Sequence, residues 1–362
     1  MKRRTGMLAM VCLVAALAGC SNTSTAQETT TAVETQEEST VVQEKSETTT
    51  QAVKVENVAE TTAVEAEEQS YPFQMTVYDS AGTAYEQTFE QAPERVVTTT
   101  TSAAELLIAL GLEDKIVGII TPDNQVPEEI QPIFDGFVNL GDKKTLSKEV
   151  IVAADPDLVI GRVANFTEET SIDSYAELGI LSYTQLAGNS AVTSSPKALL
   201  DDIRNLGAIF DVKEEADAYA NELEQRLEDI KESVSERETE TPLRSLMMVN
   251  LNEGVFGVMN GQLQDEIMTM LGCEDVADKG QSGLSYENLI QYNPDVIIYI
   301  TADRNAATDE KAVETLLSEA LLKSIPAIAN EKIITVKYDC IMDVGPRMYD
   351  TIEELNTFLS TE

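Results

Sequence analysis

Short apolar runs alternate with amphipathic segments from residue 71 to the end of the chain. The run from Tyr71 to Tyr78 alternates as a strand does, Asp79 to Gly82 is typical of a turn, and Ala84 to Phe89 predicts a return strand. Further strands are expected over 95–100, 115–120, 157–161, 179–183 and 244–251. Helices are expected over 103–110, with Ser102 as N-cap, over 147–154 and over 174–178. This alternation of strands and helices predicts parallel α/β layers.

A long amphipathic pattern separates these α/β segments into two groups. Apolar residues recur at spacings of three and four from Lys213 to about Arg237, after a shorter helical pattern over 196–210. A helix of ~25 residues is roughly 37 Å long at 1.5 Å per residue, longer than most helices in one small domain. We therefore expect a rigid helix between two lobes. The predicted N-terminal lobe is 71–195, the linking helices are 196–241, and the C-terminal lobe is 242–362.

An internal repeat supports two related lobes. Residues 146–160 and 284–298 align without gaps, and six of the fifteen positions are identical. Each copy has a Ser-x-Glu unit at the start of a predicted helix and Pro-Asp before a predicted strand. Ser147 and Ser285 would cap the helices, and Glu149 and Glu287 would favour the helix dipole. The alternative is that these two exposed carboxylates, one in each lobe, form a two-point docking surface for basic sites on a partner.

The N-terminus has the pattern of an export signal. Three basic residues follow Met1, an apolar run extends from Met7 to Leu17, and Leu-Ala-Gly precedes Cys20. This pattern is typical of a bacterial lipoprotein signal over 1–19, with a lipid attached to Cys20; an ordinary secretory signal is the alternative. Residues 20–70 are rich in Thr and Glu and lack a periodic apolar pattern, which predicts a disordered tether. The protein is therefore expected outside the cytoplasm, held at the cell membrane by its lipid.

The amino-acid composition disfavours several classes of function. The chain has 25 Lys and Arg against 64 Asp and Glu, and a formal net charge of -39 that disfavours binding to nucleic acid. It has no His, so the usual general base and the commonest zinc ligand are missing. We expect no catalytic residue, no cofactor and no bound metal of its own. Outside the signal, Cys273 and Cys340 could form a disulfide or remain buried free thiols.

Several segments resemble the iron-siderophore and cobalamin class of ABC-transporter substrate-binding proteins. Pro93 to Gly118 is similar to the opening of that class, and both Ser-x-Glu…Pro-Asp units match it. Leu271 to Asp278, Leu322 to Ile334 and Gly345-Pro-Arg347 match as well. The resemblance extends from about Tyr71 to Phe358, and the order and spacing of these segments are specific.

The resemblance implies a fold and a partner. The implied fold is α/β, with two Rossmann-like lobes of parallel sheets, joined by one long helix of the helical-backbone (class III) type, and a ligand cleft between the lobes. It also implies that Glu149 and Glu287 contact arginines of an ABC permease dimer and that the receptor is a monomer. The implied activity is capture of a metal chelate, with a ferric siderophore as the leading ligand and cobalamin or another corrinoid as the alternative. An ectodomain that senses or adheres without transport is the alternative of another class.

Candidate ligand contacts follow from the carboxyl ends of the predicted strands, where α/β proteins bind ligands. These candidates are Thr100, Ser102, Asp123, Asn124, Arg162, Asn252, Arg304, Tyr338 and Arg347. Arg162 and Arg304 each follow a Pro-Asp strand, and such a pair would suit an anionic chelate; two solvated loop arginines are the alternative. The segment 280–285 has no aromatic residue, which argues against a stacked corrin, and the lack of His argues against haem, zinc and manganese.

Overall fold

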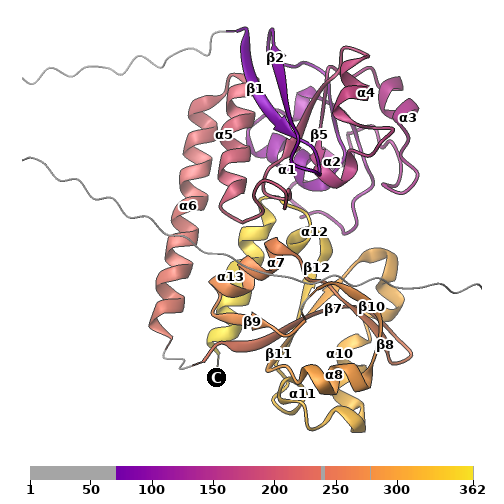
Figure 1. The fold of residues 1–362 in the computed structure, drawn as a ribbon, viewed down its shortest axis with the longest axis vertical. Helices are drawn as coiled ribbons and strands as arrows, with labels where there is room; N and C mark the ends of the chain where they lie inside the picture. The colour runs from indigo at the N-terminus through magenta and orange to yellow at the C-terminus, as the bar shows by residue number, and fades with distance from the viewer. Residues whose placement is uncertain (1–70, 238–240, 278, 362) are drawn as a thin grey trace, which may run out of the picture. The chain divides into compact units, whose positions relative to one another are not determined.

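The computed structural model describes residues 71–237, 241–277 and 279–361, and the predicted signal, Cys20 and tether lie outside these ranges. The described chain forms two α/β lobes, and α6 (Lys213–Glu236) runs alongside both of them (Figure 1). The predicted long helix is therefore confirmed almost to the residue.

The N-terminal lobe is built on a four-stranded parallel sheet of order β4-β3-β5-β6. Its strands are short and mostly buried, as expected when helices cover both faces of a parallel sheet. The strands are β3 Val96–Thr98, β4 Ile116–Ile119, β5 Leu158–Arg162 and β6 Leu181–Gln185. The helices are α1 Thr101–Ala109, α2 Gln131–Phe134, α3 Lys148–Ala153 and α4 Ile172–Ala176.

The first helix begins earlier than the sequence predicts. Thr100 is its N-cap, and its hydroxyl accepts a hydrogen bond from the Ala103 N–H at 3.2 Å. The Ser102 hydroxyl instead donates to the Thr100 hydroxyl oxygen at 3.1 Å. The prediction that Ser102 caps this helix is therefore wrong: in a run of hydroxyl residues, the one with extended backbone becomes the cap.

A separate hairpin, β1 (Phe73–Tyr78) and β2 (Ala84–Phe89), covers the outer edge of β6. The Gln87 amide donates to Ser182 O at 2.5 Å and accepts from Ser182 N–H at 2.8 Å. One side-chain amide thus satisfies the backbone groups of an edge strand as a neighbouring strand would.

Two packed helices leave the N-terminal lobe. The helix α5 (Ala198–Phe210) lies against α6, and a Cβ added at Gly207 would stand 2.3 Å from the Ala216 Cβ. Glycine at this position therefore allows the close approach of the two helices. At its other end, α6 contacts the C-terminal helix α13 (Arg347–Ser360), because Arg226 bonds Glu353 and Asp350, each at 2.6 Å.

The C-terminal lobe has a mixed sheet, not a purely parallel one. The strands β9, β7, β11 and β12 pair in parallel, whereas β8 is antiparallel to β7 and β10 is antiparallel to β8. Glu253 and Gly254 take positive φ angles of 49° and 80°, which turn β7 directly back into β8. The strands are β7 Leu243–Asn252, β8 Val255–Val258, β9 Cys273–Asp275, β10 Gln281–Ser285, β11 Val296–Thr301 and β12 Ile333–Lys337. Besides α13, the helices are α7 Gln262–Met270, α8 Tyr286–Tyr292, α9 Ala306–Asp309, α10 Ala312–Ser318, α11 Pro326–Ala329 and α12 Tyr338–Ile341.

The internal repeat corresponds to one helix-to-strand unit in each lobe, α3–β5 and α8–β11. Asp157 accepts hydrogen bonds from the backbone N–H groups of Glu94 and Arg95 at 2.8 and 3.0 Å, and the Arg95 side chain donates to Ala154 O at 2.7 Å.

In the second lobe, Asp295 accepts from the Arg244 N–H at 3.0 Å, and the Arg244 side chain donates to Tyr292 O at 2.7 Å. The Pro-Asp dipeptide therefore ties the repeated strand to the first strand of its lobe. An arginine also covers free carbonyl groups at the end of the preceding helix.

Cys273 and Cys340 are both buried and both free, so the two residues form no disulfide.

Candidate functional site

The carboxyl ends of the strands of the two lobes face each other, and one loop of the N-terminal lobe is bonded directly to the C-terminal lobe. The Asn124 N–H donates to Asp339 Oδ2 at 2.9 Å, and the Asp339 N–H donates to Asn124 Oδ1 at 3.2 Å. The Asn124 amide also donates to Thr301 O and to Asp303 Oδ1, each at 3.3 Å. We call these contacts the interlobe clasp.

Burial affects the electrostatics of the clasp. Asn124 and Asp339 are both 2 % exposed. The pKa of Asp339 is raised to about 7, first by burial and then by the nearby Asp343 carboxylate, against the opposing effects of the Asn124 N–H and the Arg347 guanidinium. Asp339 is therefore the titratable group of the clasp near neutral pH.

Beside the clasp, two cations converge on one aromatic ring. Lys143 Nζ lies 4.7 Å from the centroid of the Tyr338 ring, and Arg304 Cζ lies 4.9 Å from it. Both cations also form ion pairs with Asp123. The structure thus brings together Asp123, Arg304 and Tyr338 from the sequence candidates, and it adds Lys143. Nothing local in the polar stretch 141–145 distinguishes Lys143 from a solvated lysine.

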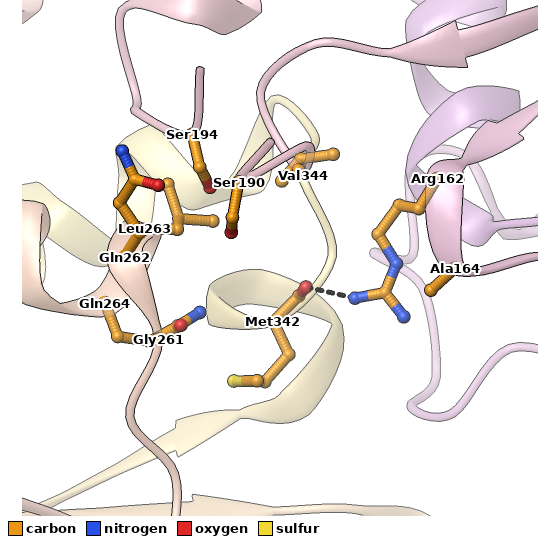
Figure 2. Close-up of a pocket in the computed structure, with 11 residues that line it drawn as sticks. Arg162, Ala164, Ser190, Ser194, Gly261, Gln262, Leu263, Gln264, Met342 and Val344 are labelled. Carbon is orange, nitrogen blue, oxygen red and sulfur yellow. Dashed lines mark hydrogen bonds between the residues drawn. The ribbon is translucent and has the colours of Figure 1, made fainter. Parts of the chain in front are cut away.

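Arg162 reaches from the end of β5 across to the other lobe. Its Nη1 donates to Met342 O at 2.5 Å and lies 3.4 Å from Asp343 Oδ1 (Figure 2). Arg162 and Arg304 therefore both lie where the lobes meet, but each is paired with an aspartate.

A pocket next to Arg162 is lined by both lobes. Figure 2 shows Arg162 and Ala164 on one side and Ser190, Ser194 and Leu263 on the other, with Met342 below. The full lining is Arg162, Ala164, Gly188, Ser190, Ser194, Gly261, Gln262, Leu263, Gln264, Met342 and Val344. Its volume is about 160 Å³. Hydroxyl, amide and guanidinium groups beside a few apolar side chains suit a ligand rich in oxygen.

The sequence analysis missed most of this lining. Ser190 and Ser194 follow β6, and Gln262 and Gln264 begin α7, both at glycine-containing loops after strands. Because Ser190 and Ser194 follow the carboxyl end of β6, the strand pattern could have pointed to them. The strand pattern did not point to the residues at α7. The preceding strand, β8, runs antiparallel, and the loop after it reaches the lobe junction only in the folded protein.

Three sequence candidates do not line this pocket: Thr100 and Ser102 are buried, and Arg347 is largely shielded. Thr100 and Ser102 are 3 % and 1 % exposed. Arg347 Nη2 pairs with Glu105 Oε1 at 2.7 Å, where α13 meets α1. Asn252 is exposed at the turn between β7 and β8 and does not line the pocket either. The structure thus differs from the expectation because the segment 339–345 packs down onto α1 and covers the ends of the central strands.

Glu149 and Glu287 are exposed at equivalent places in the repeat, each two residues after the N-cap serine of its helix. The pKa of each carboxyl is lowered, first by a hydrogen bond with that serine, Ser147 or Ser285. Both side chains are therefore free to meet a partner in their charged form.

Within 71–237, 241–277 and 279–361, no helix is long and apolar enough to cross a membrane. Over the same part of the chain, no group of three or more Cys, Asp or Glu side chains is placed to hold a metal ion.

Comparison with known proteins identifies the family. The model of the periplasmic binding protein family matches residues 96–339, more than half of the chain. An uncharacterized ABC transporter substrate-binding lipoprotein of Bacillus subtilis, YvrC, is 24 % identical over 301 residues, covering 83 % of this chain and 90 % of that protein. A cobalamin-binding protein of Halobacterium salinarum is 25 % identical over 295 residues, covering 80 % of this chain and 75 % of that protein.

A solved structure shares the fold. The crystal structure of an ABC-type Fe3+-hydroxamate transport system protein from Saccharomonospora viridis matches with a TM-score of 0.65 at 19 % identity, covering 81 % of this chain and 100 % of that one. The predicted fold and resemblance are confirmed. The chain belongs to the periplasmic binding protein family, and it is similar to ABC-transporter substrate-binding proteins of that family.

Proposed function

We propose that this protein captures a metal chelate, with a ferric siderophore as the leading candidate, and delivers it to an ABC permease. The observation that carries the proposal is the pocket lined by both lobes, with Arg162 on one wall and hydroxyl and amide groups on the other. Siderophore complexes present many oxygen atoms, and guanidinium, hydroxyl and amide groups can donate hydrogen bonds to them.

The pocket volume bears on how such a ligand would enter. At about 160 Å³ it is smaller than the ~300–1,000 Å³ of typical ligand pockets. A chelate would therefore need the lobes to move apart, and the interlobe clasp would have to loosen. An anionic chelate would also compete with Asp343 for Arg162 and with Asp123 for Arg304 and Lys143.

Cobalamin is the second candidate, and a specific observation favours it. A relative that is 25 % identical to this chain over 295 residues is a cobalamin-binding protein. Against it, the residues that line the pocket include no aromatic side chain on which a corrin could stack.

A thermal-shift panel distinguishes the ligands. The full chain would be heated with ferric catecholate, hydroxamate and carboxylate siderophores, cobalamin, cobinamide and haem. A ligand at 100 times its Kd stabilises the folded state by about 2.7 kcal/mol, which raises Tm by several degrees. A selective shift with a ferric siderophore supports the leading proposal, and one with cobalamin alone replaces it. No shift with any chelate would contradict both.

We further propose that Glu149 and Glu287 dock onto basic residues of the permease dimer. Three observations support this docking role: both residues are exposed, both are charged, and they lie at equivalent positions of the repeat. Reversing both charges, E149R with E287R, should leave chelate binding unchanged and abolish uptake by cells. The matched control is E214R with E232R, two exposed glutamates of α6. Uptake that survives the E149R/E287R change would contradict the docking role.

Cys20 is proposed to carry a lipid that anchors the protein outside the cytoplasm. Radiolabelled palmitate should enter the mature protein, and C20A should both lose the label and release the protein from membranes. Labelling that persists in C20A would contradict this role.

A further inference from the structure

The docking glutamates are held by their own capping serines. The Ser285 hydroxyl donates to Glu287 Oε2 at 2.5 Å, while the Ser285 N–H donates to Asn288 Oδ1 at 2.9 Å. In the other lobe, the Ser147 hydroxyl accepts from the Val150 N–H at 3.4 Å. Ser147 is also the first cause that lowers the pKa of the Glu149 carboxyl. The serine-to-carboxylate contact is therefore a short distance in the C-terminal copy, and the equivalent serine acts on the carboxyl pKa in the N-terminal copy.

The serine-to-carboxylate bond restrains a glutamate side chain that is otherwise exposed to solvent. Glu149 and Glu287 are both exposed, so a free carboxylate would sample many rotamers. A hydroxyl that donates to the charged carboxylate fixes one rotamer and favours the ionised form. An arginine prefers a carboxylate of defined direction, because its guanidinium makes two parallel hydrogen bonds.

We propose that Ser147 and Ser285 are positioning residues for the permease contact: each orients the carboxylate two residues ahead and keeps it charged for a basic site on the partner. This inference rests on the proposed docking role of Glu149 and Glu287. It goes beyond helix capping, because a cap needs only a hydroxyl that accepts a backbone hydrogen bond, whereas this role needs the hydroxyl to donate as well.

The test separates the two roles by the choice of substitution. Glycine is a tolerated N-cap, so S147G with S285G removes the hydroxyls at little cost to the helices, and S147T with S285T keeps them. A matched control is S171G, because Ser171 caps the equally short α4 and is also followed two residues later by an acid, Asp173. Tm of each full-length variant shows whether folding is affected.

The first readout is binding to the permease. The permease is first identified from solubilised membranes of the source cell, by capture that the full chain supports and the E149R/E287R variant does not. It is then purified into nanodiscs. The double glycine variant should bind it about three- to tenfold more weakly at neutral pH, because the two carboxylates must then lose rotamer freedom on binding. The threonine and S171G variants should bind as the unchanged protein does.

The second readout is the pH dependence. The serine hydroxyls lower the pKa of both glutamates, so their removal should raise it towards the ordinary value. The glycine variant should then lose permease binding at a higher pH, and carbon-13 NMR titration of the two carboxyl groups should show the same upward shift.

The outcomes distinguish a failure of the positioning role of the serines from a failure of the docking role of the glutamates. If E149R/E287R removes binding but the glycine variant keeps full affinity and unchanged carboxyl pKa values, the positioning role is wrong and the docking role stands. If no membrane protein is captured in a manner that depends on the two glutamates, both are wrong.

Discussion

The ion pair between Arg347 and Glu105 is largely shielded from water. The two side chains are 11 % and 5 % exposed, and Arg347 Nη2 lies 2.7 Å from Glu105 Oε1. Burial raises the pKa of Glu105, and the Arg347 guanidinium opposes this rise. Each charge is therefore tolerated at the lobe junction because the other is present.

Replacing one partner should cost more than replacing both. R347M leaves Glu105 buried without its cation and should lower the free energy of unfolding by about 3–5 kcal/mol. The double variant R347M/E105M should recover most of that loss, because two apolar side chains need no partner. Urea unfolding at pH 7 measures both. Equal losses in the two variants would contradict this account.

Buried aspartates give the folded protein a distinctive response to pH. The pKa of Asp339 is about 7, and that of Asp202 is raised to about 7, mainly by burial. An unfolded aspartate has a pKa of about 4, so between pH 4 and 7 the folded chain binds more protons than the unfolded chain. The contribution of these groups to stability is therefore lost as pH rises through that window.

The variant D339N should weaken this pH dependence. Its side chain does not titrate, and it keeps an oxygen that can accept from the Asn124 N–H. Compared with the unchanged protein, D339N should gain about 1–4 kcal/mol in relative stability between pH 5 and pH 8. Parallel stability curves for the two proteins across that range would be the contrary result.

At the scale of elements, α5 and α6 act as one unit because glycine lets them touch. The missing side chain at Gly207 leaves room for the Ala216 methyl. The long amphipathic pattern in α6 thus finds a complementary surface on α5, and both helices belong to a hydrophobic core that includes residues of both lobes. Helix propensity alone would favour alanine at position 207.

G207A should therefore destabilise the protein although it introduces a better helix former. The new methyl would overlap Ala216, and separating the helices should cost about 1–3 kcal/mol. Chemical denaturation measures the change, with E222A on the exposed face of α6 as the control. A more stable G207A protein would show that the helices can part without loss.

At the scale of the whole molecule, the interlobe clasp joins two lobes that the long helix α6 also connects by sequence. Its centre is Asn124, whose side chain and N–H contact two segments of the C-terminal lobe, 301–303 and Asp339. Under the proposed function, a chelate larger than the pocket of about 160 Å³ would enter only after these contacts loosen.

N124A should open the lobes in the absence of ligand. Without the amide, Thr301 O, Asp303 and the Asp339 N–H lose their bonds to the other lobe. The radius of gyration from X-ray scattering should increase, and the Asp339 amide should exchange its hydrogen faster. N305A is the control, because Asn305 bonds Asn250 within one lobe. A variant as compact and as protected as the unchanged protein would argue that the clasp does not hold the lobes.

Much of this architecture could be predicted from the sequence. A feature could be predicted where its interactions are local in the chain, and could not where they join distant residues. The strands, the 24-residue α6 and the repeat that carries Glu149 and Glu287 are visible because local periodicity and spacing encode them. The antiparallel β8 and β10, the meeting of Lys143 with Tyr338 and the pocket lining from α7 are not visible. Burial of Thr100 and Ser102 and the ion pair of Arg347 with Glu105 are hidden in the same way. These features join residues far apart in the chain, and no local pattern records which distant side chain will lie opposite. The sequence by itself determined the elements and the paired glutamates, whereas the tertiary structure decided which polar groups face the pocket and which are used to hold the lobes together.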